Sequence, residues 1–551
     1  MKSGIKKLNM WQVLAFAILA LFLMFVVYPI GLILYKSILM QDGSISFSYF
    51  GKFFSKKFYW STLVNSFKVT IASTLVSAVL GLIMAYVLRS VQIKGSKYLN
   101  ILIVISYLSP PFIGAYAWVQ LLGRNGFITR ILNSMFNVQL GGIYGFSGIV
   151  LVFSLQSFPL VYMYVSGALK NLDNSLNEVA ESLGCSVFQR VTRVIVPLVT
   201  PTLLASSLLV FMRVFSDFGT PMLIGEGYKT FPVLLYSQFM GEVSTDDHYA
   251  AALCVIVIGI TLILFFLQKY IGNKLTYSMS ALKPMQAEKA TGIRNILAHA
   301  FVYLVVLVAV LPQLTVISTS FMETKGASYT GQFTLENYKN ILTPKNISTI
   351  TNTYLFGLAA ILLVVVLGVL VSYLTVRKRS FLTSILDTLT MFPYIIPGSV
   401  LGISFLYAFN RKPLLLSGTA IIIIISLCIR RMPYTIRSST AIIGQISPSI
   451  EEAAISLGAT ERKTFLKIMV PMMMAGVLSG AIMSWITLIS ELSSSIILYT
   501  SKTQTLTVAI YAEVIRSNFG NAAAYSTILT FTSVLSLLLF FKVSGNNDIS
   551  V

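Results

Sequence analysis

The sequence predicts an all-α polytopic membrane protein with about 12 transmembrane helices, arranged as two homologous halves of six. Three observations support this prediction: the chain is strongly apolar, its apolar runs are long enough to cross a bilayer, and one polar motif occurs twice. Of the 551 residues, 56% are hydrophobic and 11% are charged, and the mean hydropathy is +0.81. This composition excludes a soluble protein of this size.

The apolar runs divide evenly between the two halves. A helix that crosses the hydrocarbon core needs roughly 20 mostly apolar residues. The first half offers six such runs: Trp11 to Ser37, Thr62 to Leu88, Tyr98 to Leu122, Tyr144 to Ala168, Val194 to Phe218 and Tyr249 to Tyr270. The second half offers Ile293 to Ser320, Asn352 to Val376, Phe381 to Phe409, Thr419 to Ile436, Ile468 to Leu492 and Ala522 to Phe541. We therefore expect one repeat at residues 1–280 and another at 281–551. The first run is too long for the core of a signal peptide and is expected to remain as a span.

A polar stretch, SPSIEEAAISLGATERKTFLKIMVP, interrupts the apolar runs from Ser447 to Pro471. Ser447 is a suitable N-cap, and Ser449 and Glu452 have the spacing of a capping box, so a helix is expected to begin here. Gly458 is expected to end that helix in a left-handed conformation. Four apolar residues lie at helical spacing in between: Ile450, Ala453, Ala454 and Leu457. The sequence thus predicts a short amphipathic helix, a glycine turn and a second helix that leads into the next span.

The same construction occurs earlier, at about residues 173–197, as DNSLNEVAESLGCSVFQRVTRVIVP. Seven pairs of matching residues are each 274 positions apart. They are Asp173 and Ser447, Ser175 and Ser449, Glu178 and Glu452, Ala180 and Ala454, Gly184 and Gly458, Ser186 and Thr460, and Pro197 and Pro471. This constant spacing, close to half the chain length, indicates an internal duplication.

These two stretches, which we call the elbows, resemble the signature loop of bacterial ABC-importer permeases, E-A-A, three residues, G, nine residues, then I-x-L-P. The second elbow departs from that pattern only at Val470, whereas the first departs at Val179, Val194 and Val196. In that family the loop is a cytoplasmic coupling helix seated in a groove of the ATPase subunit. The resemblance implies an ATPase-coupling role for Glu178, Ala180, Gly184, Pro197, Glu452, Ala453, Ala454, Gly458 and Pro471. The alternative is an ordinary helix-turn-helix connection.

The distribution of basic residues predicts the orientation. Lys and Arg cluster before the first span, after the second, between the halves and after the eighth. These connections fall on one side if both termini are cytoplasmic, and both elbows then face the cytoplasm. The loop that contains Lys52, Lys56 and Lys57 is an exception. This bias accounts for the net charge of +21 better than nucleic-acid binding does.

Prolines and acidic residues mark candidate positions for a pathway or gate. Pro111 interrupts the third expected span and Pro397 the ninth, where a broken helix either lines a cavity or is a simple kink. Asp217 and Glu491, 274 residues apart, end the spans that follow the elbows. Each is either a functional group within the membrane or a cap at the interface. The outward segments that follow, Gly219 to His248 and Ser493 to Asn521, are expected to form re-entrant or surface helices.

The sequence offers no catalytic motif. GEGYKT at Gly225 to Thr230 lacks the spacing of a P-loop, so ATP hydrolysis is expected in a separate subunit. Two histidines and three cysteines, dispersed along the chain, predict neither a metal site nor a disulfide framework, and no cofactor is expected. The protein is therefore expected to move a solute and not to transform it.

The resemblance extends over nearly the whole chain and is greatest to fused permeases of bacterial ferric-iron uptake systems. SDFGTPMLIGEGYKTFPVLLYSQF and ELSSSIILYTSKTQTLTVAIYAEV are the stretches that resemble that subgroup most. It implies a multi-pass protein of the bacterial plasma membrane that works with two ATPase copies and an extracellular or periplasmic solute-binding protein. Permeases for 2-aminoethylphosphonate or thiamine have a similar architecture and stay as alternatives. An ion-coupled secondary transporter is the alternative class, but it would need ionisable residues deep in several spans, where few are expected here. A scaffold would leave both elbows unexplained.

Overall fold

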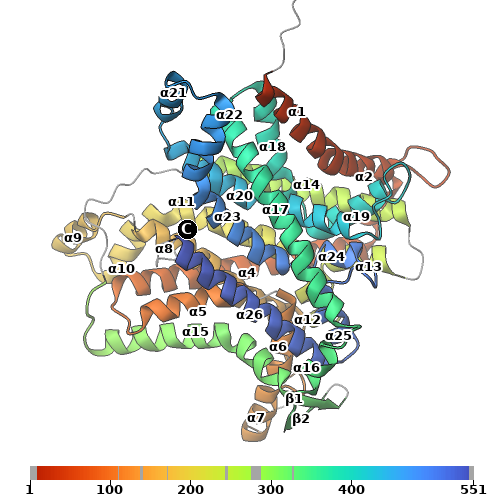
Figure 1. Cartoon of the computed structure of the whole chain (residues 1–551). Helices are drawn as coiled ribbons and strands as arrows, with labels where there is room; N and C mark the ends of the chain where they lie inside the picture. Colours follow the sequence, from red (N-terminus) through yellow and green to blue (C-terminus); the bar gives the residue numbers. More distant parts are fainter. Residues whose placement is uncertain are drawn as a thin grey trace, which may run out of the picture.

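The computed structural model describes residues 9–108, 111–136, 141–170, 172–241, 246–274, 287–325 and 328–544 (Figure 1). These residues are overwhelmingly helical, so the predicted all-α class is confirmed. Eight helices are long and apolar enough to cross a membrane, and three bent helix pairs bring the number of candidate spans in the described ranges to 11. The chain is a polytopic membrane protein.

The first half runs from the N-terminal span to the helix before the central linker. Its elements are α1 (Met10–Phe22), η1 (Leu23–Val27), α2 (Tyr28–Ile38), α3 (Ser48–Ser55), α4 (Lys57–Ser90), α5 (Ser96–Leu108), α6 (Pro111–Leu122), α7 (Phe127–Phe136), α8 (Gly145–Lys170), α9 (Ser175–Ser182), α10 (Val187–Arg190), η2 (Val191–Ile195), α11 (Val196–Ser216), α12 (Gly219–Ile224), α13 (Phe231–Met240) and α14 (Asp247–Lys274). The elements labelled η are π-helical turns.

The second half repeats this order with three differences: a two-stranded hairpin is added, no helix corresponds to α7, and the first span has no π-turn. Its elements are α15 (Gly292–Ser320), β1 (Met322–Lys325), β2 (Ser328–Phe333), α16 (Glu336–Ile341), α17 (Ile347–Arg377), α18 (Phe381–Ile395), α19 (Gly398–Phe409), α20 (Ala420–Gln445), α21 (Ser449–Ser456), α22 (Glu461–Thr464), η3 (Phe465–Met469), α23 (Val470–Ile489), α24 (Ser495–Leu498), α25 (Leu506–Ile515) and α26 (Phe519–Ser544). The antiparallel pair β1 and β2 was not predicted from the sequence.

One predicted span differs in character from the other 11. The tenth, expected from Thr419 to Ile436, forms the long helix α20, but this helix is not among the candidate spans. It carries Arg430, Arg431 and Arg437 in its middle. The expectation that the spans hold few ionisable residues is therefore wrong for this helix.

The first helix of each half packs against the opposite half. The N-terminal pair α1 and α2 contacts α18 and α19 of the second half, whereas α15, which begins the second half, contacts α5 and α6 of the first (Figure 1). Val302 and Val306 of α15 accordingly lie in one hydrophobic cluster with Ile103 and Val104 of α5. Each half thus packs its first span against the other half. The two halves are therefore joined by two apolar contacts as well as by the covalent linker.

Small residues let the central helices approach closely. Ser77 of α4 donates a hydrogen bond to the carbonyl of Ser154 on α8 at 3.3 Å, and Ser372 of α17 donates to that of Ile436 on α20 at 3.1 Å. A Cβ atom at Gly368 would lie 2.8 Å from Thr435 Cγ2. Close contacts of this kind are typical of helix packing within membranes.

A π-turn followed by proline occurs three times. The turns η1, η2 and η3 each end two residues before a proline, at Pro29, Pro197 and Pro471. A proline in a helix lacks the N–H donor and crowds the preceding turn, and the wider π-turn accommodates that crowding. The η2 and η3 turns are themselves 274 residues apart, so the duplication extends to the details of the backbone.

The segments that follow α11 and α23 fold back between the spans. The apolar helices α13 and α25 are too short to cross a membrane, and their first halves, Phe231 to Tyr236 and Leu506 to Ile510, are buried. Their N-termini are held by α4 and α17, because Ser66 accepts a hydrogen bond from Phe231 N at 2.8 Å and Thr353 accepts one from Leu506 N at 2.7 Å. These helices are therefore buried elements and not surface helices.

Candidate functional site: two elbows and a cavity between the halves

Both elbows end their first helix in the same way. Gly184 and Gly458 have φ values of 80° and 87°, in the left-handed region where glycine is favoured. The following residues donate hydrogen bonds back into the helix, from Cys185 N to Ala180 O and from Ala459 N to Ala454 O, both at 3.0 Å. This is the hydrogen bond of a Schellman motif, so the turn predicted at both glycines is present.

The second helix of each elbow begins at a hydroxyl cap. Ser186 Oγ accepts a hydrogen bond from Gln189 N, and Thr460 Oγ1 accepts one from Lys463 N, each at 3.3 Å. In both elbows the chain then passes through a π-turn and a proline into the span, which fixes the angle between the elbow and α11 or α23.

The predicted capping box at the start of the second elbow is wrong. The helix α21 begins at Ser449, so Ser449 is inside the helix and is not its N-cap. The backbone N–H of Ser449 donates a weak hydrogen bond to Ser447 Oγ at 3.4 Å. In the first elbow Asp173 Oδ1 likewise accepts a hydrogen bond from Ser175 N at 3.0 Å. Both helices are therefore preceded by a side-chain turn that satisfies an N-terminal donor.

The predicted apolar stripe packs inside the chain only in part. Ala454 is buried, as is Ala180 in the first elbow, but Leu457 is 89% exposed and Leu183 is 78% exposed. Ile455 and Val179 are also exposed. Each elbow thus presents apolar side chains on its surface, and a protein partner would bury them.

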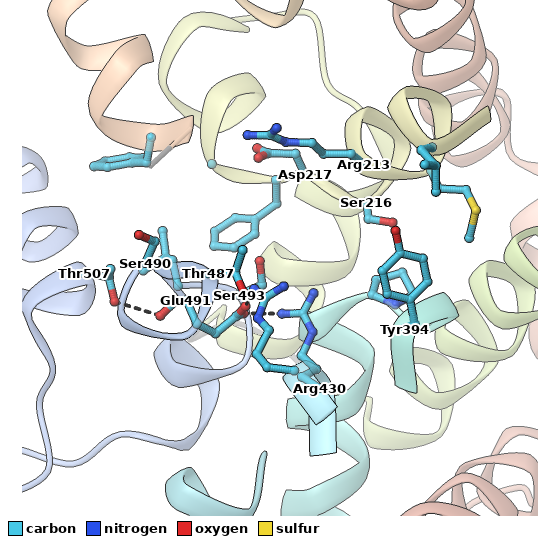
Figure 2. A pocket seen from close by; sticks show the side chains of 18 of the residues that line it. Arg213, Ser216, Asp217, Tyr394, Arg430, Thr487, Ser490, Glu491, Ser493 and Thr507 are labelled. Atoms are coloured by element: carbon cyan, nitrogen blue, oxygen red, sulfur yellow. Dashed lines mark hydrogen bonds and ion pairs between the residues drawn. The ribbon is translucent and has the colours of Figure 1, made fainter. Parts of the chain in front are cut away.

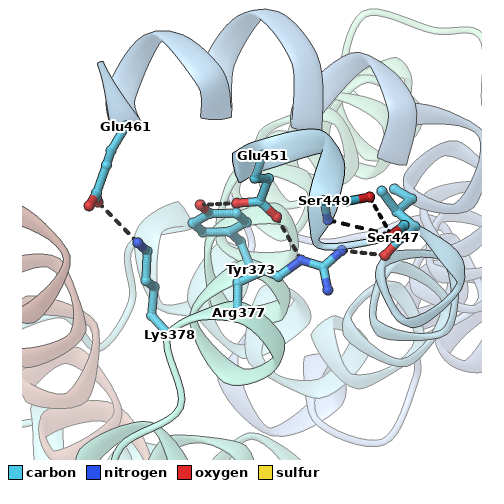
Figure 3. Close-up of polar contacts among 8 residues, drawn as sticks. Tyr373, Arg377, Lys378, Ser447, Ser449, Glu451 and Glu461 are labelled. Carbon is cyan, nitrogen blue, oxygen red and sulfur yellow. Dashed lines mark hydrogen bonds and ion pairs between the residues drawn. The ribbon is translucent and has the colours of Figure 1, made fainter. Parts of the chain in front are cut away.

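The second elbow is tied to the end of α17 by a polar cluster (Figure 3). Glu451 receives hydrogen bonds from Arg377 Nε at 2.6 Å and from the Tyr373 hydroxyl at 2.8 Å. Arg377 also donates to the Ile446 carbonyl at 2.5 Å, immediately before the elbow. The two charged side chains are mostly buried, at 12% and 13% exposure, so the pair constrains where α21 lies relative to α17.

The N-terminal helix is tied to the same elbow. Glu461 accepts hydrogen bonds from Trp11 Nε1 at 2.5 Å and from Lys378 Nζ at 3.0 Å. The Trp11 ring also packs on Tyr373 and Phe465, with ring centroids 4.8 and 5.2 Å apart. A helix of the first half therefore helps to hold the elbow of the second.

The first elbow is held differently. The position that corresponds to Glu451 is Asn177, which cannot form the same ion pair. The ion pair described there is internal to the elbow, between Arg190 and Glu181 at 2.5 Å. The pair of Arg377 with Glu451 therefore has no counterpart at the equivalent position of the first elbow.

A cavity of about 280 Å³ lies between the two halves (Figure 2). The first half contributes residues of α5, α6, α8, α11 and α12, and the second contributes residues of α18, α20, α23 and α25. Its polar lining includes Tyr107, Tyr164, Arg213, Ser216, Asp217, Tyr394, Arg430, Arg431, Tyr434, Thr487, Ser490, Glu491, Ser493 and Thr507. The equivalent ends of α11 and α23 thus meet around one chamber.

Both acidic residues singled out in the sequence line this cavity. Asp217 ends α11, and its carboxylate accepts a hydrogen bond from Thr220 N at 3.0 Å. Glu491 is 4% exposed and accepts a hydrogen bond from Ser494 N at 3.2 Å. Each is therefore a cap for the outward segment, and each also faces the chamber, so the two alternatives considered for these residues are not exclusive.

Three arginines in the cavity were missed in the sequence. Arg430 and Arg431, adjacent on α20, each bind one carboxylate oxygen of Glu491. Arg213 lies on the opposite wall with its guanidinium 4.4 Å from the Tyr107 ring centroid, and Figure 2 shows it beside Asp217. The signal was available, because basic residues inside an expected span are costly unless they pair or face water.

The proline breaks have different outcomes. The bend of 110° between α18 and α19 places Pro393 and Pro397 in the cavity wall. A break that lines a cavity is the alternative that fits this site. Pro111 begins α6, but its side chain lies outside the described part of the structure, and so does the whole of Pro110.

The described residues contain no group of three or more His, Cys, Asp or Glu side chains that could hold a metal ion. The polar side chains that line the cavity carry hydroxyl, guanidinium and carboxylate groups. A ligand in the cavity would therefore meet oxygen and nitrogen groups, and no histidine or thiolate.

The fold and the site define a duplicated membrane-transport protein with two elbow motifs and one chamber between its halves. The chain belongs to the family described as the binding-protein-dependent transport system inner membrane component, whose model matches residues 77–277 and 365–544. It is the permease of a binding-protein-dependent ABC importer, and the two matched segments correspond to its two halves.

Two relatives and one solved structure are similar to all or part of the chain. The chain is 28% identical, over 97% of its length and 78% of the relative, to the ferric transport system permease protein FbpB of Actinobacillus pleuropneumoniae. It is 26% identical, over 45% of its length and 86% of the relative, to a putative 2-aminoethylphosphonate transport system permease protein PhnU of Salmonella typhi. A chain in the crystal structure of a bacterial ABC transporter that imports alginate matches 48% of this chain and 96% of its own length, with 16% identity and a TM-score of 0.40.

Proposed function

We propose that this single chain supplies both halves of the transmembrane pathway of an ATP-driven importer and presents its two elbows to two copies of an ATPase subunit. The observation that supports this is the pair of elbows with the same glycine turn, the same cap and an exposed leucine at the same position. A partner that contacts one elbow therefore finds an equivalent surface on the other.

The proposed orientation puts the elbows and both ends of the chain on the cytoplasmic side. The basic residues of the sequence favour this arrangement. The short helices α12, α13, α24 and α25 then lie toward the outside, where an extracellular or periplasmic solute-binding protein would deliver its cargo. Glu178 and Glu452, at equivalent positions in the elbows, are proposed to contact the ATPase.

Ferric iron is the proposed cargo, because the relative named as a ferric transport permease aligns with nearly the whole chain. The test is uptake of radioactive iron by cells that lack the gene, carrying either the wild-type gene or an empty vector. We expect the wild-type gene to restore uptake, with growth on 2-aminoethylphosphonate unaffected by the deletion. Unchanged iron uptake in the deleted strain would contradict the assignment.

A second candidate cargo is 2-aminoethylphosphonate. Two observations favour it: one half of the chain aligns with a permease of that name, and three arginines line the cavity. If the deleted strain cannot grow on this compound as its phosphorus source but takes up iron normally, the cargo is 2-aminoethylphosphonate.

A further inference from the structure

The cavity between the halves has an excess of positive charge. Its charged lining consists of three guanidinium groups, Arg213, Arg430 and Arg431, and two carboxylates, Asp217 and Glu491. The other titratable groups in the lining are tyrosines, which are neutral hydrogen-bonding groups at physiological pH. A bare ferric ion entering this chamber would meet a net positive wall.

Two of the arginines that line the chamber have an N–H donor without a hydrogen-bond acceptor in the described structure. Arg431 Nε and Arg213 Nη1 are buried and have no hydrogen-bond partner within the described structure. The hydroxyl of Ser490, which lines the same chamber, is likewise buried without one. A guanidinium N–H that is buried without an acceptor is unfavourable, so oxygen atoms of a ligand would be stabilised here.

The chamber already holds one oxyanion of its own. The Glu491 carboxylate takes one contact from Arg430 and one from Arg431, which is how two planar guanidinium groups bind a compact oxyanion. Glu491 lies outside helices α23 and α24, in the short segment that joins them. An incoming anion would therefore compete with a side chain on a connecting segment.

The duplication does not account for these arginines. The position equivalent to Arg213 is Thr487, and those equivalent to Arg430 and Arg431 are Gln156 and Ser157. The basic residues thus reach one chamber from unrelated positions on α11 and α20. Their shared feature is the cavity that they line.

We propose that the chamber is an oxyanion site, and that the cargo passes through it either as a free oxyanion or as a metal ion whose outer ligands are oxyanions. This inference rests on the proposed function as a permease. The inference extends that function, because oxyanion ligands around a ferric ion would let the ion pass a chamber that is lined by arginine. The oxygens of the cargo bind Arg213 on one wall and displace Glu491 from Arg430 and Arg431 on the other.

The test is equilibrium binding to the purified full-length chain in lipid nanodiscs. The probes are radiolabelled inorganic phosphate, for a free oxyanion, and radiolabelled ferric citrate, for an anionic metal complex, with chloride at matched ionic strength as background. We expect saturable binding of at least one probe. Phosphate binding alone identifies the free oxyanion, and ferric citrate binding alone identifies the metal complex. Binding of neither would overturn the proposal.

Four variants make the test specific. Arg213→Gln and Arg431→Gln should each weaken binding by tenfold or more, because each removes donors that face the chamber. Glu491→Gln should tighten binding severalfold, because it frees two guanidinium groups. Arg437→Gln is the matched control: it removes an arginine from the same helix, but one that is 56% exposed and pairs with Asp387 outside the cavity. Its binding should equal that of the wild type.

The Glu491→Gln variant keeps the proposal falsifiable if an arginine variant fails to fold. Unchanged or weaker binding by folded Glu491→Gln would overturn the site, as would wild-type binding by Arg213→Gln or Arg431→Gln. Because the assay uses no ATPase and no uptake, it separates the two proposals. A chain that binds phosphate through these arginines but does not restore iron uptake would refute the ferric cargo and leave the oxyanion site standing.

Discussion

Tyr236 and Tyr511 are each the sixth residue of a short helix, one in each half of the chain, and their rings meet, with centroids 6.3 Å apart and planes at 73°. Tyr236 lies on α13 and Tyr511 on α25. Phe218 stacks on Tyr236 at 4.8 Å, and Phe112 packs on Tyr511 at 5.1 Å. The contact therefore joins corresponding short helices of the two halves, and it lies beside the cavity, because Phe218 and Ile510 line the cavity wall.

This contact predicts a stability effect. Tyr511→Ala removes a ring from the interface between the halves and should lower the free energy of unfolding by about 3 kcal/mol. Tyr511→Phe keeps the ring and is the control, with an expected loss within about 1 kcal/mol. Denaturation of the purified protein in detergent measures both. Equal stability of the alanine and phenylalanine variants would show that the ring contact contributes nothing.

The glycine of the second elbow predicts a coupling effect. Gly458 has nothing within 4 Å of the position of an added Cβ, so strain in Gly458→Val comes from the left-handed backbone and not from a clash. That strain costs about 1–2 kcal/mol and should redirect the turn. We expect normal amounts of the variant in the membrane. Iron uptake should be severalfold lower, and less ATPase should co-purify with the variant than with the wild type.

Gly444→Val is the matched control for this prediction. Gly444 is an exposed glycine inside α20 that also has open space around it, and its φ is not positive. Its valine variant should transport like the wild type. If Gly458→Val transports and recovers the ATPase as well as this control, the elbow does not depend on the turn.

The unequal attachment of the elbows predicts unequal dynamics. The ion pair between Arg377 and Glu451 ties α21 to α17, whereas Asn177 occupies the equivalent place in α9. In hydrogen exchange, α21 should be better protected than α9. Glu451→Gln should lose the charged contact, at a cost of about 1.5–3 kcal/mol, and raise the exchange of α21 toward that of α9. Exchange of α21 that is already as fast as that of α9 in the wild type would contradict this prediction.

A native cysteine predicts how the topology can be measured. Cys185 follows Gly184 and is partly exposed, whereas Cys254 and Cys428 are buried. A membrane-impermeant maleimide should therefore label Cys185 in inside-out vesicles and leave intact cells unlabelled. Ala459→Cys adds a probe at the equivalent position of the second elbow and should behave in the same way. Labelling of either position from outside intact cells would reverse the proposed orientation. The linker residue Lys283, also expected on the cytoplasmic side, lies outside the described residues.

The sequence predicted the elbows well because their structure is local. A glycine in a left-handed turn and a hydroxyl that caps a helix depend on neighbouring residues, and both were recognisable at Gly184, Gly458, Ser186 and Thr460. The capping box at Ser449 was wrong for an equally local reason, because the helix begins at Ser449 itself, one residue earlier than the pattern required.

The cavity could not be predicted in the same way. It forms where α20 meets the ends of α11 and α23. These helices are far apart in the sequence, so no local sequence pattern predicts that they come together. The reciprocal packing of α1 and α15 on the opposite halves is likewise a property of the assembled fold. Arg430 and Arg431 were visible in an expected span, but their partner Glu491 is about 60 positions away, and only the structure brings them together.

In the proposed complex, one chain offers two equivalent elbows to two ATPase subunits. Native mass spectrometry of the complex, purified through a tag on this chain, measures this stoichiometry. We expect one copy of this chain with two copies of the ATPase, and a complex with a single ATPase copy in Gly458→Val. A wild-type complex with one ATPase per chain, or with two copies of this chain around two ATPase subunits, would contradict it.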